Sequence, residues 1–250
     1  MKNKIYLIIG ASSEVGIAFL KSLNRKLEEK EEKAVILAHY ALHAEQLLEL
    51  KENASALDLT LLQADLSQPQ EIDNLTIQIA ECCDCPDYII HLPASKLIYN
   101  RIKQYNWQSI LEDMEIQVHS LWEIGKKFLP KMGKIGAGKV VVMLTSCTIG
   151  MPPKFMSQYV VAKYALLGLM KSMAIDFADK GINVNGISPN MMETKFLEKI
   201  DNKIIEMNRD SSILKRNVKV EEVVSAIHFL LSEGSDYMNG VNLNLTGGDR

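Results

Sequence analysis

The sequence predicts an α/β fold, built as one doubly wound parallel sheet of about seven strands with helices on both faces. Seven short aliphatic runs recur along the chain, and longer amphipathic stretches lie between them. The runs are apolar at nearly every position, which is typical of strands that are buried on both faces. Since no Gly-, Pro- or Ser-rich linker interrupts this alternation, we expect a single domain over residues 1–250.

The expected strands and helices follow one another in regular order. The strands are placed at 5–9, 35–38, 60–63, 88–91, 140–144, 182–187 and 241–245. The first helix is expected from four apolar residues at helical spacing: Ile17, Leu20, Leu23 and Leu27. Similar patterns predict helices around 47–50 and 72–79, and from about 114 to 132, 157 to 179 and 220 to 232.

Composition and charge exclude several classes of protein. The 250 residues are 47% hydrophobic and carry 28 Lys and Arg against 31 Asp and Glu, a net charge of −3. This balance argues against disorder and against a nucleic-acid or anionic membrane partner. No apolar run is long enough for a membrane span or a signal-peptide core, so a cytoplasmic location is expected. Cys82, Cys83 and Cys85 lack a second ligand pair, which favours reduced thiols and no metal site.

A glycine-containing turn over residues 10–16 follows the first expected strand and opens the first helix. In a doubly wound sheet a dinucleotide diphosphate binds at such a turn, because glycines admit the backbone and the helix N-terminus offers free N–H groups. The turn contains Gly10, Ser12, Ser13, Glu14, Val15 and Gly16. The Glu14 carboxylate would repel a diphosphate unless its side chain turns away.

Tyr159 and Lys163 are spaced i and i+4, so they share one face of the helix expected at 157–179. A lysine ammonium there favours the tyrosinate, and the lowered phenol pKa would make Tyr159 an acid/base near neutral pH. Ser146 precedes Tyr159 by thirteen residues and follows the strand at 140–144. It lies at the carboxyl edge of the sheet, where its hydroxyl can hold a substrate carbonyl.

Together these motifs resemble the short-chain dehydrogenase/reductase family along the whole chain, which implies a Rossmann-like fold. The resemblance implies that Ser146, Tyr159 and Lys163 are catalytic. The family's fourth catalytic residue is an Asn that holds a water molecule in a proton relay. In this sequence the corresponding position is Gln117, whose side chain has the same amide group one carbon further from the backbone.

The resemblance also implies further coenzyme-binding positions. Asp65 and Leu66 fit the site that receives the adenine ring. His91-Leu92-Pro93-Ala94 stands where the family has Asn-Asn-Ala-Gly, and Asn190 stands where the family has the Gly of Pro-Gly. The coenzyme positions implied in these two later segments are Leu92, Pro93, Ala94, Pro189, Met192 and Thr194.

The end of the second expected strand bears on the choice of coenzyme. NAD enzymes often carry an acid there to bind the adenosine ribose. Here the sequence reads Leu37-Ala38-His39-Tyr40, so NADP(H) is favoured over NAD(H), with His39 placed to approach a 2′-phosphate.

We therefore expect an NAD(P)(H)-dependent oxidoreductase that interconverts a carbonyl and an alcohol, acting on a 3-oxoacyl thioester or a sugar-type ketone. The alternative is a nucleotide-binding homologue with weak or no activity, acting as a regulatory or scaffolding subunit. The resemblance further implies a homo-oligomer, a tetramer or a dimer. The helices that would form it carry side chains that suit either an interface or the core: Trp122, Phe128, Leu166, Leu169 and Met170.

Overall fold

The seven expected strands all form, and they build one parallel sheet. The computed structural model describes residues 3–248, so residues 1–2 and 249–250 of the expected domain lie outside the described part. The strands are β1 (Lys4–Ile9), β2 (Ala34–Tyr40), β3 (Leu57–Gln63), β4 (Tyr88–His91), β5 (Gly138–Met143), β6 (Ile182–Pro189) and β7 (Asn242–Leu245). Their order across the sheet is β3-β2-β1-β4-β5-β6-β7, which confirms the predicted fold class.

The strand order reverses direction between β1 and β4. Leu7 of β1 lies opposite Leu37 of β2 on one side and opposite Ile89 of β4 on the other. Chain connections therefore leave β1 and β4 toward opposite edges of the sheet. Such a switch point opens a crevice at the carboxyl ends of the strands, where ligands bind in folds of this type.

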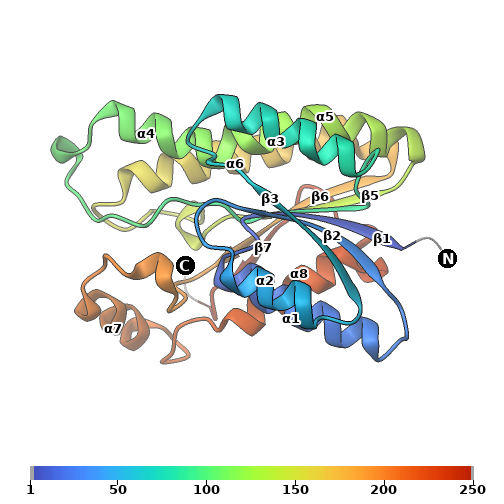
Figure 1. Cartoon of the computed structure of the whole chain (residues 1–250). Coiled ribbons are helices and arrows are strands. Elements are labelled where there is room, and N and C mark those ends of the chain that lie inside the picture. The colour runs from blue at the N-terminus through green and yellow to red at the C-terminus, as the bar shows by residue number, and fades with distance from the viewer. Residues whose placement is uncertain (1–2, 249–250) are drawn as a thin grey trace.

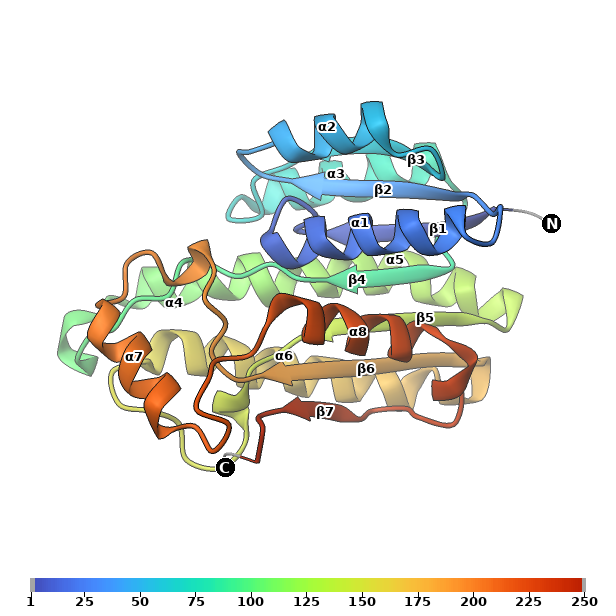
Figure 2. The same ribbon diagram turned by 90° about the horizontal axis from the view of Figure 1, so that it is seen from below.

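Helices cover both faces of the sheet (Figures 1 and 2). One face carries α1 (Glu14–Glu28), α2 (Glu45–Asn53) and α8 (Val220–Leu231). The other carries α3 (Pro69–Cys82), α4 (Trp107–Met114), α5 (Ser120–Ile135) and α6 (Ser157–Asp176). A further helix, α7 (Asn202–Ser211), lies beyond the carboxyl ends of the strands (Figure 2).

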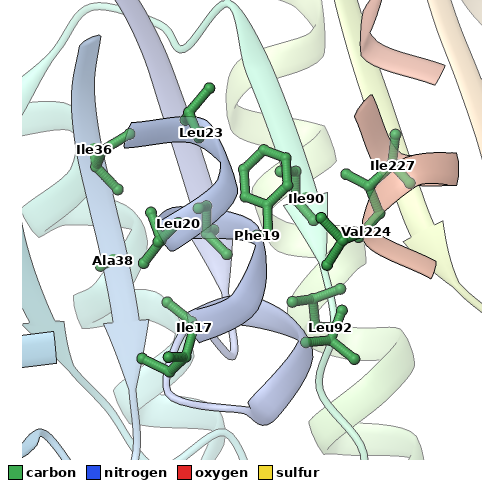
Figure 3. Packing of buried hydrophobic residues seen from close by; sticks show 14 of the residues in the cluster. Ile17, Phe19, Leu20, Leu23, Ile36, Ala38, Ile90, Leu92, Val224 and Ile227 are labelled. Atoms are coloured by element: carbon green, nitrogen blue, oxygen red, sulfur yellow. The ribbon is translucent and has the colours of Figure 1, made fainter. Parts of the chain in front are cut away.

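Two buried clusters hold these layers together, because successive strand residues point to opposite faces. In the first cluster Phe19 of α1 packs beside Ile90 of β4 and Ile227 of α8 (Figure 3). The second joins Leu7 and Ile9 of β1 to α3, α5 and α6. It contains Phe128, Leu166 and Met170, which are therefore core residues, whereas Trp122 is 53% exposed.

The helical region before β5 differs from the sequence prediction. A single helix was expected from about 114 to 132, but α4 comes first and a π-helical turn at Glu115–His119 joins it to α5. Helix α7 was also not predicted. None of the helices within residues 3–248 combines the length and the apolar character that a membrane crossing requires. Over the same range no group of three His, Cys, Asp or Glu side chains is arranged to hold a metal ion.

Candidate active site

A cavity of about 1470 Å³ lies at the carboxyl edge of the sheet. It is lined by the loops that follow the strands and by the N-terminal turns of α1 and α6. Of the predicted site residues, only Gly16 and Gln117 are not part of its lining. The others all line it: Gly10, Ser12, Ser13, Glu14, Val15, His39, Asp65, Leu66, Leu92, Pro93, Ala94, Ser146, Tyr159, Lys163, Pro189, Met192 and Thr194.

The turn between β1 and α1 requires glycine at both ends. Gly10 has a φ of +77°, and a Cβ there would lie 3.3 Å from the backbone nitrogen of Pro93. A Cβ on Gly16 would lie 2.4 Å from the carbonyl oxygen of Ala11, so only hydrogen fits. Ser13 caps the helix by accepting a hydrogen bond from Gly16 N at 3.2 Å. The N-terminus of α1 is thereby held against the cavity, as a diphosphate site requires.

Glu14 turns away from this helix N-terminus. Its Oε2 accepts a hydrogen bond from the backbone nitrogen of Lys195 at 2.7 Å. Lys195 begins a short 3₁₀ helix, Lys195–Leu197, in the segment after β6. We call this segment, residues 190–213, the covering segment, because several of its residues line the cavity. The carboxylate is therefore engaged by the covering segment, which removes the conflict that the sequence raised for a diphosphate at this turn.

The His39 ring is hydrogen-bonded to the glycine-containing turn. Its Nδ1 accepts from Gly10 N at 3.0 Å, and its Nε2 lies 3.0 Å from the carbonyl oxygen of Ala64. Because a carbonyl oxygen only accepts, Nε2 carries the proton and the ring is neutral. Burial lowers the pKa of His39 to about 4. This contradicts the expected role beside a 2′-phosphate, since both nitrogens are occupied and the ring carries no charge at neutral pH.

The same end of the cavity is lined by two residues that the sequence analysis did not select, His43 and Glu45. The His43 Nδ1 lies 3.9 Å from the Glu45 carboxylate. Asp65 stands nearby at the end of β3 and accepts a hydrogen bond from Ser67 N at 2.9 Å. His43 lies in the loop after β2 and Glu45 is the first residue of α2, so strand-end reasoning could not place them.

Helix α6 positions Tyr159 and Lys163 together in the cavity. The Lys163 Nζ donates to the carbonyl oxygen of Met143 at 2.7 Å and lies 5.8 Å from the centre of the Tyr159 ring. Burial lowers the pKa of Lys163 to about 7, an effect that the nearby Asp113 opposes. Burial raises the pKa of Tyr159. The expected lowering of the phenol pKa is therefore wrong for the chain by itself, because desolvation raises this pKa more than the Thr145 side chain lowers it.

Thr145 is the hydroxyl residue that contacts Tyr159. Its side chain hydrogen-bonds the Tyr159 hydroxyl, which partly offsets the rise in the phenol pKa, and it also accepts from Cys147 N at 3.3 Å. Ser146, the residue selected from the sequence, begins the next 3₁₀ helix, Ser146–Thr148, and lines the cavity. The contact between Thr145 and Tyr159 depends on how the chain leaves β5, which sequence spacing does not reveal.

A buried polar network fixes the N-terminus of α6. The Asp113 carboxylate, 3% exposed, accepts from the hydroxyl of Ser95 and from Gln158 Nε2, the latter at 2.9 Å. The Gln158 Oε1 in turn accepts from the Ser109 hydroxyl at 3.0 Å. The network joins the loop after β4 to α4 and to the residue that precedes Tyr159. Sequence reasoning missed it because α4 was not predicted.

Gln117 is fully buried in the π-helical turn, and neither of its amide atoms has a hydrogen-bond partner among the described residues. His91, at the end of β4, has the same feature at Nδ1. The Ser120 hydroxyl donates to Ile116 O at 2.6 Å, so it accepts from His91 Nε2 at 3.0 Å, which leaves Nδ1 with a free lone pair. Buried polar atoms without protein partners are normally satisfied by ordered water.

Comparisons with known proteins show what the whole chain is similar to. A family model described as "Enoyl-(Acyl carrier protein) reductase" matches residues 10–249. The chain is 27% identical to "Uncharacterized oxidoreductase YmfI" of Bacillus subtilis (strain 168), over 98% of each chain. It is 23% identical to human "Dehydrogenase/reductase SDR family member 4", over 99% of this chain and 88% of that protein.

Two solved structures have closely similar folds. Levodione reductase superposes with a TM-score of 0.84 at 21% identity, covering 98% of this chain and 96% of its own. NAD⁺-bound xylitol dehydrogenase gives the same TM-score of 0.84 at 20% identity, covering 98% of each chain. At these identities, the structures establish the shared fold alone.

Proposed function

The chain belongs to the short-chain dehydrogenase/reductase family, and from this premise we propose that it is an NAD(P)(H)-dependent oxidoreductase interconverting a carbonyl and an alcohol. The observation that carries the proposal is the pairing of Tyr159 with Lys163 at the cavity, with Thr145 on the phenol. The alternating strands and helices bring these three groups to the carboxyl edge of the sheet. A purely structural protein has no physical need of such a constellation.

The cavity fits a nicotinamide dinucleotide. Gly10 and Gly16 have no side chain, so neighbouring backbone packs directly against them. The N-terminus of α1 therefore remains accessible to a diphosphate. Asp65 and Leu66 would contact the adenine, and Pro189, Met192 and Thr194 would lie beside the nicotinamide. When bound, this coenzyme supplies or accepts a hydride at its nicotinamide ring.

The residues of the chain supply the proton chemistry. Tyr159 donates a proton to the carbonyl oxygen in reduction and receives it in oxidation, while Ser146 and Thr145 orient that oxygen and the phenol. Lys163 stabilises the tyrosinate that results and contacts the nicotinamide ribose. Its pKa of about 7 allows it to lose or regain a proton near neutral pH. Gln117, together with His91, holds water behind this lysine and supports the return of the proton.

For the coenzyme we propose NADP(H) in preference to NAD(H). The proposal rests on position 39, where an acid would bind the ribose of NAD and this chain has a neutral histidine. Glu45 and Asp65 both line this end of the cavity, and Glu45 has His43 as its partner there. A parallel fluorescence titration with NADPH and NADH decides between the two. Tighter binding of NADH by tenfold or more would reverse the preference.

The catalytic roles are tested by substitution at Tyr159. Tyr159→Phe is expected to abolish detectable reduction of ketones while coenzyme affinity changes by less than about threefold, because the lost hydroxyl acts on the proton. Tyr164→Phe is the matched control, since Tyr164 lies next to the site on α6 but is 42% exposed and does not line the cavity. Full activity of Tyr159→Phe would refute the mechanism.

The second candidate is a nucleotide-binding homologue that regulates or scaffolds other proteins. Four departures from the family pattern favour it, namely Glu14, Pro93, Gln117 and Asn190. This function predicts that a folded protein binds coenzyme weakly or not at all and reduces no ketone. Ketone reduction that Lys163→Ala abolishes would exclude it.

We also propose that the protein is cytoplasmic and forms a homotetramer or homodimer through α5 and α6. These two helices present Trp122, Val161 and Tyr164 with exposed fractions of 53%, 47% and 42%. Large apolar side chains gathered on neighbouring helices are typical of an interface.

A further inference from the structure

Apolar side chains form the wall of the cavity beside Tyr159. Leu97, Met156 and Leu197 line the cavity and form a buried cluster with Ile200 behind them, and Tyr159 packs against this cluster together with Phe196, Met191 and Tyr99. The Phe196 ring lies 5.7 Å from the Tyr159 ring, centre to centre, at an interplanar angle of 49°. The wall draws on three separate parts of the chain: the loop after β4, the start of α6 and the segment after β6. The group attached to a carbonyl held at Tyr159 would therefore meet carbon and sulfur atoms.

Two polar groups next to this wall are already engaged with the protein. Thr145 hydrogen-bonds Tyr159 and accepts from Cys147 N. Asp113 is held behind the wall by Ser95 and Gln158. The hydroxyls of Tyr159 and Ser146 suffice for one carbonyl oxygen. A polyhydroxylated chain that lies against the carbon and sulfur atoms of the wall would lose its water there without gaining hydrogen-bond partners, and each such loss is unfavourable.

Three charged side chains at the rim are engaged within the protein. The Lys96 Nζ lies 2.6 Å from the Glu198 carboxylate, which joins the loop after β4 to the covering segment. The Glu14 carboxylate accepts a hydrogen bond from the backbone nitrogen of Lys195. These three groups are therefore not presented as counter-ions to a ligand at Tyr159.

We propose that the substrate is an apolar ketone, or the secondary alcohol derived from it, whose alkyl or ring carbons fill the pocket formed by Leu97, Met156 and Phe196. The inference rests on the proposed carbonyl–alcohol function and chooses among its substrates: it excludes sugar-type ketones. Binding energy in this pocket comes from the burial of carbon surface, and it increases with the number of methylene groups that fit.

The test compares ketones of equal carbon number and different polarity. The pairs are 2-pentanone against xylulose and 2-hexanone against fructose, together with the straight series from 2-butanone to 2-octanone. Two quantities are measured: kcat/KM with the preferred coenzyme, and the ketone dissociation constant by ligand-observed NMR on the coenzyme-loaded protein. We expect each added methylene to raise kcat/KM and affinity about fourfold until the pocket is full. The sugars should be at least tenfold poorer than their partners.

Phe196→Ala tests whether the named wall is responsible. It should weaken binding of 2-octanone about tenfold and that of 2-butanone much less, because only the longer chain reaches the ring. Coenzyme affinity should stay within about twofold, which would exclude general damage to the fold. Phe229→Ala is the matched control: Phe229 lies on α8, is 42% exposed and does not line the cavity.

Each outcome separates this inference from the proposed function. A flat chain-length series, or sugars that bind and react as well as alkyl ketones, overturns the apolar substrate and leaves the oxidoreductase in place. Chain-length-dependent binding without any turnover supports the apolar pocket and refutes the proposed function. An equal loss of affinity for all ketones in Phe196→Ala would remove that residue from the specificity wall.

Discussion

The Glu14 carboxylate and the backbone nitrogen of Lys195 are joined by a hydrogen bond of 2.7 Å across 181 residues of sequence. Glu14 occupies the turn where a diphosphate would bind, and Lys195 begins the short helix that covers the cavity. The bond therefore fastens the covering segment to the coenzyme end of the site. The Lys96–Glu198 pair fastens the same segment to the loop after β4.

Glu14→Ala is expected to loosen the covering segment. Without the acceptor, the backbone nitrogen of Lys195 should exchange its hydrogen at least about fivefold faster, as the loss of about 1 kcal/mol implies. Hydrogen-exchange mass spectrometry over residues 190–213 measures this. Glu45→Ala removes another carboxylate of the cavity that does not contact this segment, so it serves as the control. Unchanged exchange in Glu14→Ala would show that the bond does not hold the segment.

The buried Lys163 makes stability depend on pH. Its folded-state pKa of about 7 lies below the ordinary lysine value of 10.5, so between these values the unfolded chain binds the extra proton. The free energy of unfolding should therefore rise as pH increases from about 7 toward 9.5. In Lys163→Met this contribution is absent, and urea midpoints at pH 6.5, 8 and 9.5 measure the difference. Lys171→Met, at an exposed site on the same helix, should keep the slope of the original protein.

Two buried histidines, His39 and His91, and the partly buried His228 predict a loss of stability in acid. Burial lowers the pKa of His39 and His228 to about 4 and that of His91 to about 3, against 6.5 in the unfolded chain. Unfolding takes up protons below pH 6.5, so stability falls as pH drops from about 6.5 to about 4. His228→Gln, which keeps a polar group for Ser22, should lower the midpoint pH of acid unfolding. The exposed His43→Gln should leave it unchanged, and an equal shift in both would contradict the assignment.

Gly16→Ala should destabilise the turn that precedes α1. Its Cβ would approach backbone atoms of Ala11 to 2.4 and 2.8 Å, and backbone cannot rotate away. We expect a loss of about 1–3 kcal/mol in unfolding free energy and a weaker affinity for the coenzyme. Gly168→Ala is the matched control, because a Cβ there meets nothing within 4 Å. That change should raise stability by about 0.5–1 kcal/mol.

Trp122 tests the proposed oligomer. Trp122→Glu places a charge on the exposed part of α5 and should convert a tetramer or dimer to smaller species, because a carboxylate is costly to bury at an interface. Sedimentation equilibrium measures the change. Ile77→Glu changes an apolar side chain of α3 with a similar exposed fraction, 51%, and should have no effect. A monomeric original protein would remove the proposal.

The strands were predictable because most of them are short aliphatic runs that alternate with longer amphipathic stretches. Every expected strand is found, with bounds that differ by three residues or fewer. Helix α7 was missed because its sequence is mostly polar and its apolar face is short: Ile204 and Ile205 pack against the core only partly buried. The boundary between α4 and α5 was missed because a π-helical turn continues the helical path and leaves only a small change of phase.

The Tyr159–Lys163 pair was predictable because i, i+4 spacing fixes the geometry on one helix. Contacts between distant segments were not, since they depend on how loops return to the sheet edge. The Thr145 bond to Tyr159, the Asp113 network and the Glu14–Lys195 bond are all of this kind. The neutral state of His39 was likewise not predictable from the sequence. It depends on the backbone nitrogen of Gly10, which follows β1, and on the carbonyl oxygen of Ala64, which follows β3.

The position of β1 between β2 and β4 also constrains how the chain folds during synthesis. β1 can pair with β2 early, because a single helix separates them, but its other edge stays open until residues 88–91 have emerged from the ribosome. Pairing of β1 with β4 brings together the ends of a long chain segment, residues 10–87, and this loses conformational entropy before stabilising contacts form. Formation of the β1–β4 ladder should therefore be the slow step. Until then the backbone groups of Leu7–Ile9 on this side have no partner strand and the apolar side chains of β1 are incompletely covered. We therefore expect the nascent N-terminal part of the chain to bind chaperones.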